Sequence, residues 1–399
     1  MRSSYKKLGE YIRQVDERNK ELAIDNLLGV SITKQFIPSI ANIVGTDLSN
    51  YKIVRTGQFA YGPVTSRNGE KISVALLTGD DCIISSSYSV FEVINNKELC
   101  PEYLMLWFNR PEFDRYARYR SHGSVREIFD WEEMCSVELP VPTYSEQLRI
   151  VDAYKAIERR IELKKKINDN LRQIASTAFV NSIRYAKPSN TELYEGELGA
   201  FPVSWAISSL GDVLSTIIDH RGQTPAKLGS SWSDDGIIAL SAKSVKNHEL
   251  INLDIANRVD EELYERWMPE KLHPRDILMT SEAPLGEFYY LAKYCNYCLS
   301  QRLFALRANT DIIEPTVLYF QLTDPIGLHE IDIRKTGTTV TGIRQSELVK
   351  IPIVVPPKET QRRFALLCNP IMLEIEHNSE ECRKLEKLQN MLLTRLSSC

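Results

Sequence analysis

A glycine-rich segment from Gly57 to Gly69 is the first stretch of the chain whose residue types could hold a ligand. It places Tyr61, Arg67 and Asn68 among glycines, where a backbone can approach a partner closely. Arginine and amide side chains donate hydrogen bonds to base edges and to phosphate oxygens, so the segment suits a nucleic-acid contact. Ordinary hairpin turns have a similar composition, and this alternative stays open.

A second stretch, from residue 110 to residue 126, contains more arginines than acidic residues, with tyrosines interleaved. Its arginines are Arg110, Arg115, Arg118, Arg120 and Arg126. Nucleic-acid affinity depends on such a local basic surface and not on the net charge of the chain, which is −4. We therefore count Arg126 as a candidate contact, together with His122 and Ser124, which flank Gly123. A solvated helix face, with a solvated turn at His122, is the competing interpretation.

The second half of the chain has its own polar clusters, three of them in or next to runs that read as strands at 237–241, 277–280 and 299–306, and a fourth at 336–344. The candidate contacts in these clusters are Lys243, Ser281, Gln301, Arg302, Thr338 and Arg344. They offer the donors and acceptors that read base edges and phosphates. Each half of the chain therefore has a separate set of candidate DNA contacts.

Residue patterns for catalysis on DNA are missing from the sequence. An adenine methyltransferase needs a tetrapeptide such as NPPY to hold a flipped base and a glycine loop for the methyl donor, and the sequence has neither. It also has no Walker-type phosphate loop. We therefore expect that the chain binds neither S-adenosylmethionine nor ATP and is not itself an enzyme.

Two long helices and the globular segments before them are the elements that must position these residues. Apolar residues recur at alternating spacings of about three and four at 150–178 and again at 364–392, which is a coiled-coil pattern. Gln147 and Gln361 precede the two patterns at equivalent positions. We call the difference between these two residue numbers the repeat displacement. The same displacement relates PEYLMLWFNRPEF to EPTVLYFQLTDPI upstream. The chain is therefore predicted to repeat one globular unit and one helix in tandem.

Each helical pattern is interrupted at an equivalent point, by Lys164 in the first helix and by Asn378 in the second, and the repeat displacement relates these two positions. The neighbouring seam positions are apolar and include Ile167 and Ile174. If the helices pair antiparallel about a pseudo-two-fold axis, Lys164 and Asn378 should lie side by side as a polar layer that fixes the register. Two polar residues that extend their head groups to water are the alternative.

Composition limits the fold class and the compartment. The chain has 399 residues, of which 43% are hydrophobic, enough for two cores. Short alternating runs followed by a helix predict a mixed α/β (α+β) fold for each unit. No apolar run approaches the roughly twenty residues of a membrane span, and the first residues contain no apolar leader core, so we expect a cytoplasmic protein without membrane contact. The eight cysteines have no framework spacing, which predicts reduced thiols and no metal site.

Several segments carry a family resemblance. The first half contains GVSITKQFIPS, DLSNYKIVRTGQFAYGPVTSRNGEKISVALL, PEYLMLWFNRPEFDRYAR, GSVREIFDW and LPVPTYSEQLRIV, and the second half contains FPVSWAISSLGDV and HPRDILMT. Together with the repeated helix, they resemble the specificity (S) subunit of type I restriction–modification systems, the HsdS family. The resemblance covers nearly the whole chain. One departure is that Phe201, Pro202 and Trp205 have no counterpart before Leu8.

The resemblance implies a domain order and a fold. Target-recognition domains are expected at 1–141 and 198–355, with a central helix at 142–184, a linker at 185–197 and a C-terminal helix at 356–399. The two helices are expected to form an antiparallel coiled coil. Each recognition domain would then read one half of a bipartite site in double-stranded DNA.

The resemblance also implies partners. They are methyltransferase (M) subunits, two of them, which use S-adenosylmethionine, and restriction (R) subunits, which use ATP and Mg²⁺. This chain would hold no cofactor and no metal, and it would position target adenines for the bound methyltransferase.

Two other functions remain possible from the sequence. The first is a helical scaffold whose globular ends bind protein, and the second is the specificity subunit of a system that only methylates. The scaffold would tolerate similar loops in both halves. Here the frame repeats while the loops differ in nearly every polar residue, which favours two domains that read different half-sites.

Overall fold

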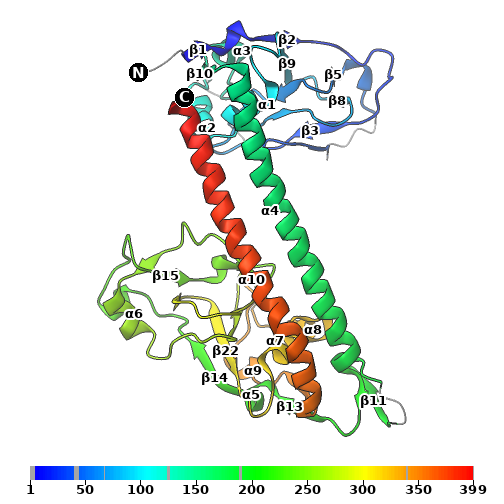
Figure 1. Cartoon of the computed structure of the whole chain (residues 1–399), viewed down its shortest axis with the longest axis vertical. Coiled ribbons are helices and arrows are strands. Elements are labelled where there is room, and N and C mark those ends of the chain that lie inside the picture. The colour runs from blue at the N-terminus through cyan, green and yellow to red at the C-terminus, as the bar shows by residue number, and fades with distance from the viewer. Residues whose placement is uncertain are drawn as a thin grey trace. The chain divides into compact units, whose positions relative to one another are not determined.

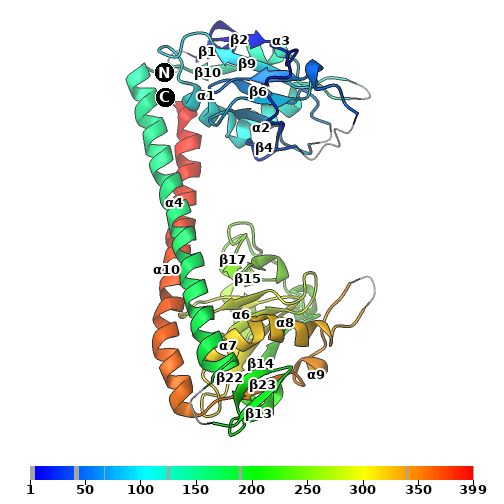
Figure 2. The same ribbon diagram turned by 90° about the vertical axis from the view of Figure 1, so that its right-hand side faces the viewer.

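The computed structural model describes residues 5–39, 45–66, 68–123, 126–187, 191–337 and 340–398. The chain forms two compact units, which we call unit 1 (residues 1–162 and 383–399) and unit 2 (residues 163–382). Helices α4 (Tyr144–Phe179) and α10 (Lys358–Arg395) are the two long ribbons in Figures 1 and 2, and each contributes residues to both units. None of the described helices is long and apolar enough to cross a membrane.

Unit 1 is built on a four-stranded antiparallel sheet. Its strand order is β2 (Ile12–Val15), β9 (Ser89–Val93), β6 (Phe59–Tyr61) and β7 (Val74–Leu76). Shorter strand pairs are β1 (Tyr5–Lys7) with β10 (Glu138–Pro140), β3 (Leu28–Val30) with β4 (Phe36–Pro38), and β5 (Lys52–Val54) with β8 (Cys82–Ile84). The helices are η1 (Leu8–Glu10), η2 (Leu48–Asn50), α1 (Pro101–Phe108), α2 (Pro111–Tyr119), α3 (Trp131–Cys135) and η6 (Leu396–Ser398).

Aromatic side chains hold the core of unit 1 together. The rings of Phe59 and Phe91 stack with their centroids 4.9 Å apart, and Phe108 of α1 meets both rings edge to face. Such aromatic pairs add to the stabilisation that apolar burial gives. Proline at the first position of α1 and of α2 starts each helix, because the missing N–H costs nothing there.

Unit 2 repeats this sheet. Its strand order is β14 (Leu214–Asp219), β22 (Leu303–Ala308), β19 (Ile277–Thr280) and β20 (Phe288–Tyr290). The helices are η3 (Val180–Arg184), α5 (Leu210–Val213), η4 (Ala226–Leu228), η5 (Ala242–Ser244), α6 (Glu261–Trp267), α7 (Pro315–Thr323), α8 (Pro325–Asp332) and α9 (Gln345–Leu348). Helices α7 and α8 begin at prolines, as α1 and α2 do.

Unit 2 also contains strands outside this sheet. They are β11 (Leu193–Gly196) with β12 (Gly199–Pro202), β13 (Ala206–Ser209) with β23 (Pro352–Val355), β16 (Val245–Lys246) with β17 (Glu249–Leu250), and β15 (Ile237–Leu240) between β18 (Arg258–Val259) and β21 (Cys298–Leu299). A second core lies under this part of the unit, with Trp267 and Leu240 fully buried in it.

The tandem repeat extends to single hydrogen bonds. The Gln147 side chain is fully buried; its Oε1 accepts from the amide of Cys100 at 2.8 Å, and its Nε2 donates to the carbonyls of Glu98 and Pro142 at 2.8 and 2.9 Å. Gln361 makes the same three bonds at 2.7, 3.1 and 2.7 Å. Its partners are the amide of Glu314 and the carbonyls of Ile312 and Pro356. The predicted duplication is therefore present in the fold of both units.

Within unit 2 the two long helices run antiparallel. Lys164 lies beside Asn378, and the ring of Phe179 packs against the ring of Phe364 with centroids 5.9 Å apart. As the residue number increases along α4, the number of the adjacent residue on α10 decreases. Ala175 and Phe179 of α4 enter the core of the unit, which also contains Phe364, Cys368 and Ile375 of α10. The predicted antiparallel pairing is confirmed for this unit.

The predicted seam of α4 is wrong at two positions. Ile167 and Ile174 are 43% and 53% exposed, while Asn168 and Ala175 are buried in their place. A spacing of about 3.5 residues leads from Ile161 through position 164 to position 168. The prediction counted Lys164 as the interruption of the seam, but it then followed the apolar residue type to Ile167 and missed the polar seam position at Asn168.

Candidate nucleic-acid interface

Two loops of unit 1 lie side by side and bring together three of the predicted contacts. His122 and Ile128 exchange both backbone hydrogen bonds, at 3.0 and 2.9 Å, which closes a hairpin over residues 122–128. Val64 bridges to Ile128, so the loop after β6, which includes Asn68, lies along this hairpin. The hairpin carries His122 and Arg126, both exposed. Asn68, His122 and Arg126 are therefore near one another in space.

Most arginines of the basic stretch already have carboxylate partners. Arg118 pairs with Glu127, and Arg120 Nε lies 2.6 Å from a carboxylate oxygen of Glu133. Arg126 has no ion-pair partner among the described residues. Since a guanidinium without a protein acceptor is free to bind a phosphate or a base edge, Arg126 is the strongest candidate of the stretch.

Tyr61 does not fit the predicted role. Its side chain is fully buried, and its ring packs edge to face against Phe91 and Phe129 at centroid distances of 6.1 and 6.5 Å. Burial also raises the pKa of its phenol. The sequence could not reveal this, because the side of β6 that faces the core depends on its neighbours β7 and β9.

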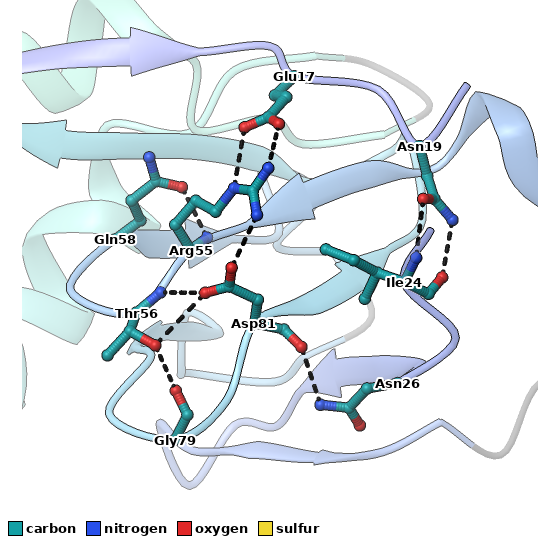
Figure 3. Close-up of polar contacts among 9 residues, drawn as sticks. All are labelled: Glu17, Asn19, Ile24, Asn26, Arg55, Thr56, Gln58, Gly79 and Asp81. Carbon is teal, nitrogen blue, oxygen red and sulfur yellow. Dashed lines mark hydrogen bonds and ion pairs between the residues drawn. The ribbon is translucent and has the colours of Figure 1, made fainter. Parts of the chain in front are cut away.

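The start of the glycine-rich segment is a structural turn, as the alternative interpretation predicts. Gly57 has φ +90, which a side chain would strain, and Gln58 N donates to the carbonyl of Arg55 at 2.9 Å. Figure 3 shows the Arg55 guanidinium pointing toward Glu17 and Asp81, with an Nη1–Oδ2 distance of 2.8 Å to Asp81. Two carboxylates thus neutralise Arg55, which leaves it no free charge for a phosphate.

Asp81 ties this turn to the neighbouring loop. Its second carboxylate oxygen accepts from the Thr56 amide at 2.9 Å, and its backbone carbonyl accepts from Asn26 at 3.2 Å (Figure 3). The hydrogen bond from Arg55 holds the pKa of Asp81 below its usual range. The network positions the loops around β5 and β8 and does not itself form a ligand site.

Unit 2 has the corresponding pair of loops. Thr336 and Gly342 exchange backbone hydrogen bonds at 2.7 and 2.9 Å, and the repeat displacement relates them to His122 and Ile128. Glu282 bridges to Gly342, as Val64 bridges to Ile128 in unit 1. The same hairpin is therefore placed against the same sheet in both units.

Arg302 and Gln301 are exposed next to this hairpin. The Ser281 amide donates to the carbonyl of Arg302 at 2.9 Å, and Arg302 Nε lies 3.0 Å from a carboxylate oxygen of Glu282. Arg302 has φ +64, an uncommon value for a residue with a side chain and one that often marks functional sites. Ser281 joins the cluster only through its backbone, because its side chain is 1% exposed.

The sequence did not single out Arg221, which the structure adds to this cluster. Its Nη1 donates to the carbonyl of Ile343 at 3.1 Å, its guanidinium is bound by Asp219, and it lies over the ring of Phe304. Arg221 therefore supports the hairpin from below. No nearby motif marks it in the sequence, since Ile343 and Phe304, which place it in the cluster, are distant along the chain.

The remaining predicted contacts of unit 2 are less closely grouped. Arg344 is exposed and starts helix α9, directly after the hairpin. Lys243 is exposed in η5, and within the described residues no contact joins its side chain to the Arg302 cluster. Arg67, Ser124 and Thr338 lie outside the residues that the structure describes.

Lys164 and Asn378 lie side by side, as the repeat predicts, with Lys164 Nζ donating to Asn378 Oδ1 at 2.7 Å. The polar layer is larger than expected. Asn168 is buried, accepts from Asn378 Nδ2 at 2.9 Å and donates to the carbonyl of Ile375 at 3.2 Å. Lys164 also pairs with Glu381 at 3.0 Å. A connected polar group of this kind inside a helix seam can specify register.

The fold, with its two repeated hairpins and its helix pair, agrees with the family that sequence comparison identifies. Residues 39–173 and 202–381 match the profile of the type I restriction modification DNA specificity domain. These matches cover more than half of the chain, so the chain belongs to the family of type I restriction–modification DNA specificity proteins. It is a non-catalytic DNA specificity subunit, and the cofactors of such systems belong to the methyltransferase and restriction subunits.

Two relatives and one solved structure illustrate the likeness. The chain is 24% identical over 329 residues to the type I restriction enzyme MjaIX specificity subunit of Methanocaldococcus jannaschii, covering 76% of this chain and 70% of that protein. It is 21% identical over 460 residues to the HindI specificity subunit of Haemophilus influenzae, covering 98% and 97%. The S subunit of a type I restriction–modification system from M. genitalium shares the fold, with a TM-score of 0.57 at 11% identity over 98% of this chain and 95% of that chain.

Proposed function

We propose that each unit reads one half of a bipartite target in double-stranded DNA. The supporting observation is one frame that carries two different sets of loop residues. The hairpin at 122–128 recurs at 336–342, yet Arg126 of the first corresponds to Val340 of the second. Equivalent loops with different side chains suit two different base sequences.

The proposed contacts are the exposed or half-exposed members of the predicted set. They are Asn68, His122 and Arg126 in unit 1 and Lys243, Gln301, Arg302 and Arg344 in unit 2. Arg67, Ser124 and Thr338 stay in the proposal on their sequence positions alone. Tyr61 and Ser281 are removed from it, because a buried side chain cannot reach DNA.

The long helices are the proposed docking surface for two methyltransferase subunits, through which restriction subunits would join. Leu163, Ile167 and Ile174 of α4 are all close to half exposed. Their spacing of four and seven residues places them on one face of the helix. Apolar side chains aligned on an exposed face support a protein-binding role.

The proposal keeps the domain order expected from the sequence. Recognition domains at 1–141 and 198–355 are separated by the central helix at 142–184 and the linker at 185–197, and the C-terminal helix at 356–399 follows. The assembled complex would act in the cytoplasm, where its DNA lies.

Co-expression with methyltransferase subunits tests the proposal by sequencing the methylated bases of the host DNA. The expected motif has two defined half-sites and an undefined spacer. Exchange of hairpin 122–128 for that of a relative should change one half-site, whereas Lys97→Ala, at an exposed turn outside the hairpin, should leave the motif unchanged. A continuous motif, or a change in both halves after the exchange, would contradict the division of labour between the units.

A further inference from the structure

Unit 1 contains a pocket that DNA reading does not use. Its volume is about 410 Å³, and Arg110 is one of its lining residues. The others are Tyr5, Trp107, Glu112, Phe113, Tyr116, Ser136, Val137, Glu138 and Ser397. Four of these lining residues are aromatic and a fifth, Val137, is aliphatic, so the pocket can hold a ligand with an apolar or aromatic body.

Arg110 is a buried cation without a matching acceptor. Its side chain is 6% exposed, and its Nε is buried with no hydrogen-bond partner. The guanidinium lies over the ring of Trp107, 4.1 Å from the ring centroid. The nearest carboxylate oxygen belongs to Glu112 at 3.6 Å, beyond hydrogen-bond distance, and Glu112 also pairs with Arg115 at 3.1 Å. A buried guanidinium left in this state costs stability unless an anion completes it.

The repeat shows what occupies the equivalent place in unit 2. The repeat displacement relates Arg110 to Asp324, which is bound by Arg184 from the end of the central helix segment. Arg184 Nε donates to Asp324 Oδ2 at 2.6 Å and Nη2 donates to Oδ1 at 3.1 Å. Arg184 also donates to the carbonyl of Leu198 at 3.0 Å. The charge at this position is thus reversed between the units, and among the described residues only unit 2 supplies a hydrogen-bonded partner of opposite charge.

A β-hairpin covers this place in unit 2. Strands β11 and β12 bring Leu198 and Phe201 over Ile326 of α8, and Tyr194 stacks on Phe201 at 4.8 Å. At the repeat displacement, Ile326 corresponds to Glu112, which lines the pocket of unit 1. The pocket at Arg110 is therefore the equivalent, in unit 1, of a place that Arg184 and the hairpin occupy in unit 2.

We propose that the pocket at Arg110 binds a carboxylate carried next to an aromatic or apolar side chain on a separate polypeptide. The carboxylate takes the role that Arg184 has in unit 2, with the charges reversed, and the apolar body takes the role of the hairpin. A planar guanidinium binds a carboxylate through two parallel hydrogen bonds, which gives such a site its selectivity.

A DNA phosphate is the less suitable occupant. Glu112 and Glu138 both line the pocket, so their charges limit the occupant to a single carboxylate paired with Arg110 and oppose a polyanion such as DNA. The aromatic walls match no part of a sugar–phosphate backbone, whereas they match the side chain of an acidic peptide. The partner is therefore an acidic segment of protein and not nucleic acid.

Titration of the full chain with small probes tests the site. Phenylacetate carries the proposed chemistry, phenylacetamide is its neutral counterpart, and inorganic phosphate represents the DNA backbone. The indole N–H signal of Trp107, assigned in ¹⁵N-tryptophan-labelled protein with a Trp107→Phe variant, reports binding in the pocket. Phenylacetate should shift this signal and bind at least ten-fold more tightly than phenylacetamide or phosphate.

Two substitutions connect the binding to Arg110. Arg110→Gln should weaken phenylacetate at least ten-fold, whereas Arg118→Gln, at an exposed position of α2 whose partner Glu127 does not line the pocket, should change it less than two-fold. Arg110→Asp should reverse the preference, so that benzamidine, an aromatic cation, binds at least ten-fold more tightly than phenylacetate. This variant should fold, because Asp324 caps α8 at the equivalent position through a 2.8 Å bond from the amide of Gly327. The proposal is overturned if phenylacetate does not shift Trp107, if phenylacetamide or phosphate binds equally well, or if Arg110→Gln retains the affinity.

Discussion

Arg302 combines an uncommon backbone conformation with an exposed charge. Its φ of +64 places the side chain where a regular strand would not, directly beside the repeated hairpin of unit 2. Glu282 holds the guanidinium at 3.0 Å through an exposed ion pair, which contributes little to stability. A base edge can therefore compete with Glu282 for the arginine at small cost.

Arg302→Ala should weaken specific DNA binding by about 1–3 kcal/mol and relax the requirement at one base position, as expected when an arginine reads a guanine edge. Both effects are measured by the affinity of the complex with methyltransferase for a set of DNA duplexes, each of which differs from the target site by one base pair. Arg266→Ala is the matched control, because Arg266 is also an exposed, ion-paired arginine of unit 2. A uniform loss across all sequences with a shallower salt dependence would instead identify a phosphate contact.

His248 gives unit 2 a dependence on pH. Burial lowers the pKa of His248, whose Nδ1 shares a 2.8 Å hydrogen bond with the hydroxyl of Tyr319; Arg172 lowers that pKa further, while Glu287 and Glu249 raise it. A lowered folded-state pKa means that folding favours the neutral ring. The contribution of the neutral His248 ring to the stability of the fold is therefore fully present above the unfolded pKa of about 6.5. It is lost as the pH falls through the folded pKa.

His248→Gln should reduce the loss of stability between pH 8 and pH 5.5. Thermal unfolding of the full chain at the two pH values measures this, with the difference in Tm expected to be smaller in the variant than in the wild type. Lys246→Gln, at an exposed position two residues from His248, is the control and should leave the difference unchanged. An equal difference in all three proteins would show that His248 does not contribute to the acid sensitivity.

At the level of elements, the polar layer between α4 and α10 shows that a helix seam can contain buried polar residues when they are hydrogen-bonded across it. Asn168 and Asn378 are both about 1% exposed, and each has its amide satisfied by the other helix. Removing one partner leaves a buried polar group unpaired, which costs more than the hydrogen bond contributes. Replacing all partners with apolar residues removes that cost.

Asn378→Leu should therefore destabilise the chain by about 1–3 kcal/mol. The substitution removes the donor to Asn168 and the acceptor of the Lys164 hydrogen bond. The triple variant with Leu at 164, 168 and 378 should recover that stability, and it should populate more than one helix register. Denaturant unfolding measures the stability, and the number of methyl NMR signal sets reports the registers. Asn170→Leu, at an exposed position of α4, controls for the substitution itself. A triple variant with a single signal set would limit the layer to a stabilising role.

The long helices and the repeat were predictable because their signals are local. The heptad pattern lies within each helix, and one displacement relates Gln147 to Gln361 and the two proline-initiated helix pairs. The exact seam was not predictable from residue type, since Asn168 is buried while Ile167 is 43% exposed. A polar residue that is satisfied across the interface gives no apolar signal in its own sequence.

The candidate contacts were predictable only as regions. The segments that form the two hairpins were identified as polar or basic clusters and not as hairpins. The burial of Tyr61 and Ser281 depends on strands that pair from distant parts of the chain. Arg110 entered the predictions as one arginine of a basic stretch. Its burial against Trp107 separates it from the others and could not be read from spacing.

The whole molecule should be modular, because each unit has its own core. Leu393 and Leu396 from the end of the chain belong to the core of unit 1, and Tyr5 donates to the carbonyl of Ser397 at 2.9 Å. An exchange of residues 1–141 with those of a relative should therefore include the relative's counterpart of residues 383–399.

That exchange should replace one half of the methylated motif and leave the other half intact. Sequencing of methylated bases in a host that carries the chimera measures the outcome, and exchange of residues 198–355 is the reciprocal experiment. A chimera that carries residues 1–141 alone should be less stable in thermal unfolding, because its core then meets a foreign helix end. Alteration of both half-sites by either exchange would mean that the units share one recognition surface.

The length of the helices should set the spacer between the half-sites. Helices α4 and α10 contain 36 and 38 residues, so at about 1.5 Å per residue they extend over roughly 54–57 Å. Insertion of one heptad into each helix would add about 10 Å, which corresponds to about three base pairs of roughly 3.4 Å. The methylated motif should keep both half-sites and gain this spacer. Insertion of one heptad into the linker at 185–197 is the control, and an unchanged spacer in the helix variant would show that another element sets the distance.

The two buried glutamines give the chain an internal replicate of one experiment. Gln147→Ala and Gln361→Ala each delete the same three hydrogen bonds, in two surroundings that differ in sequence but share a backbone plan. Any difference between the two losses of stability therefore measures context alone, without the need to compare two proteins. Because the chain repeats one unit, the two substitutions measure how far neighbouring residues change the contribution of an identical contact to stability.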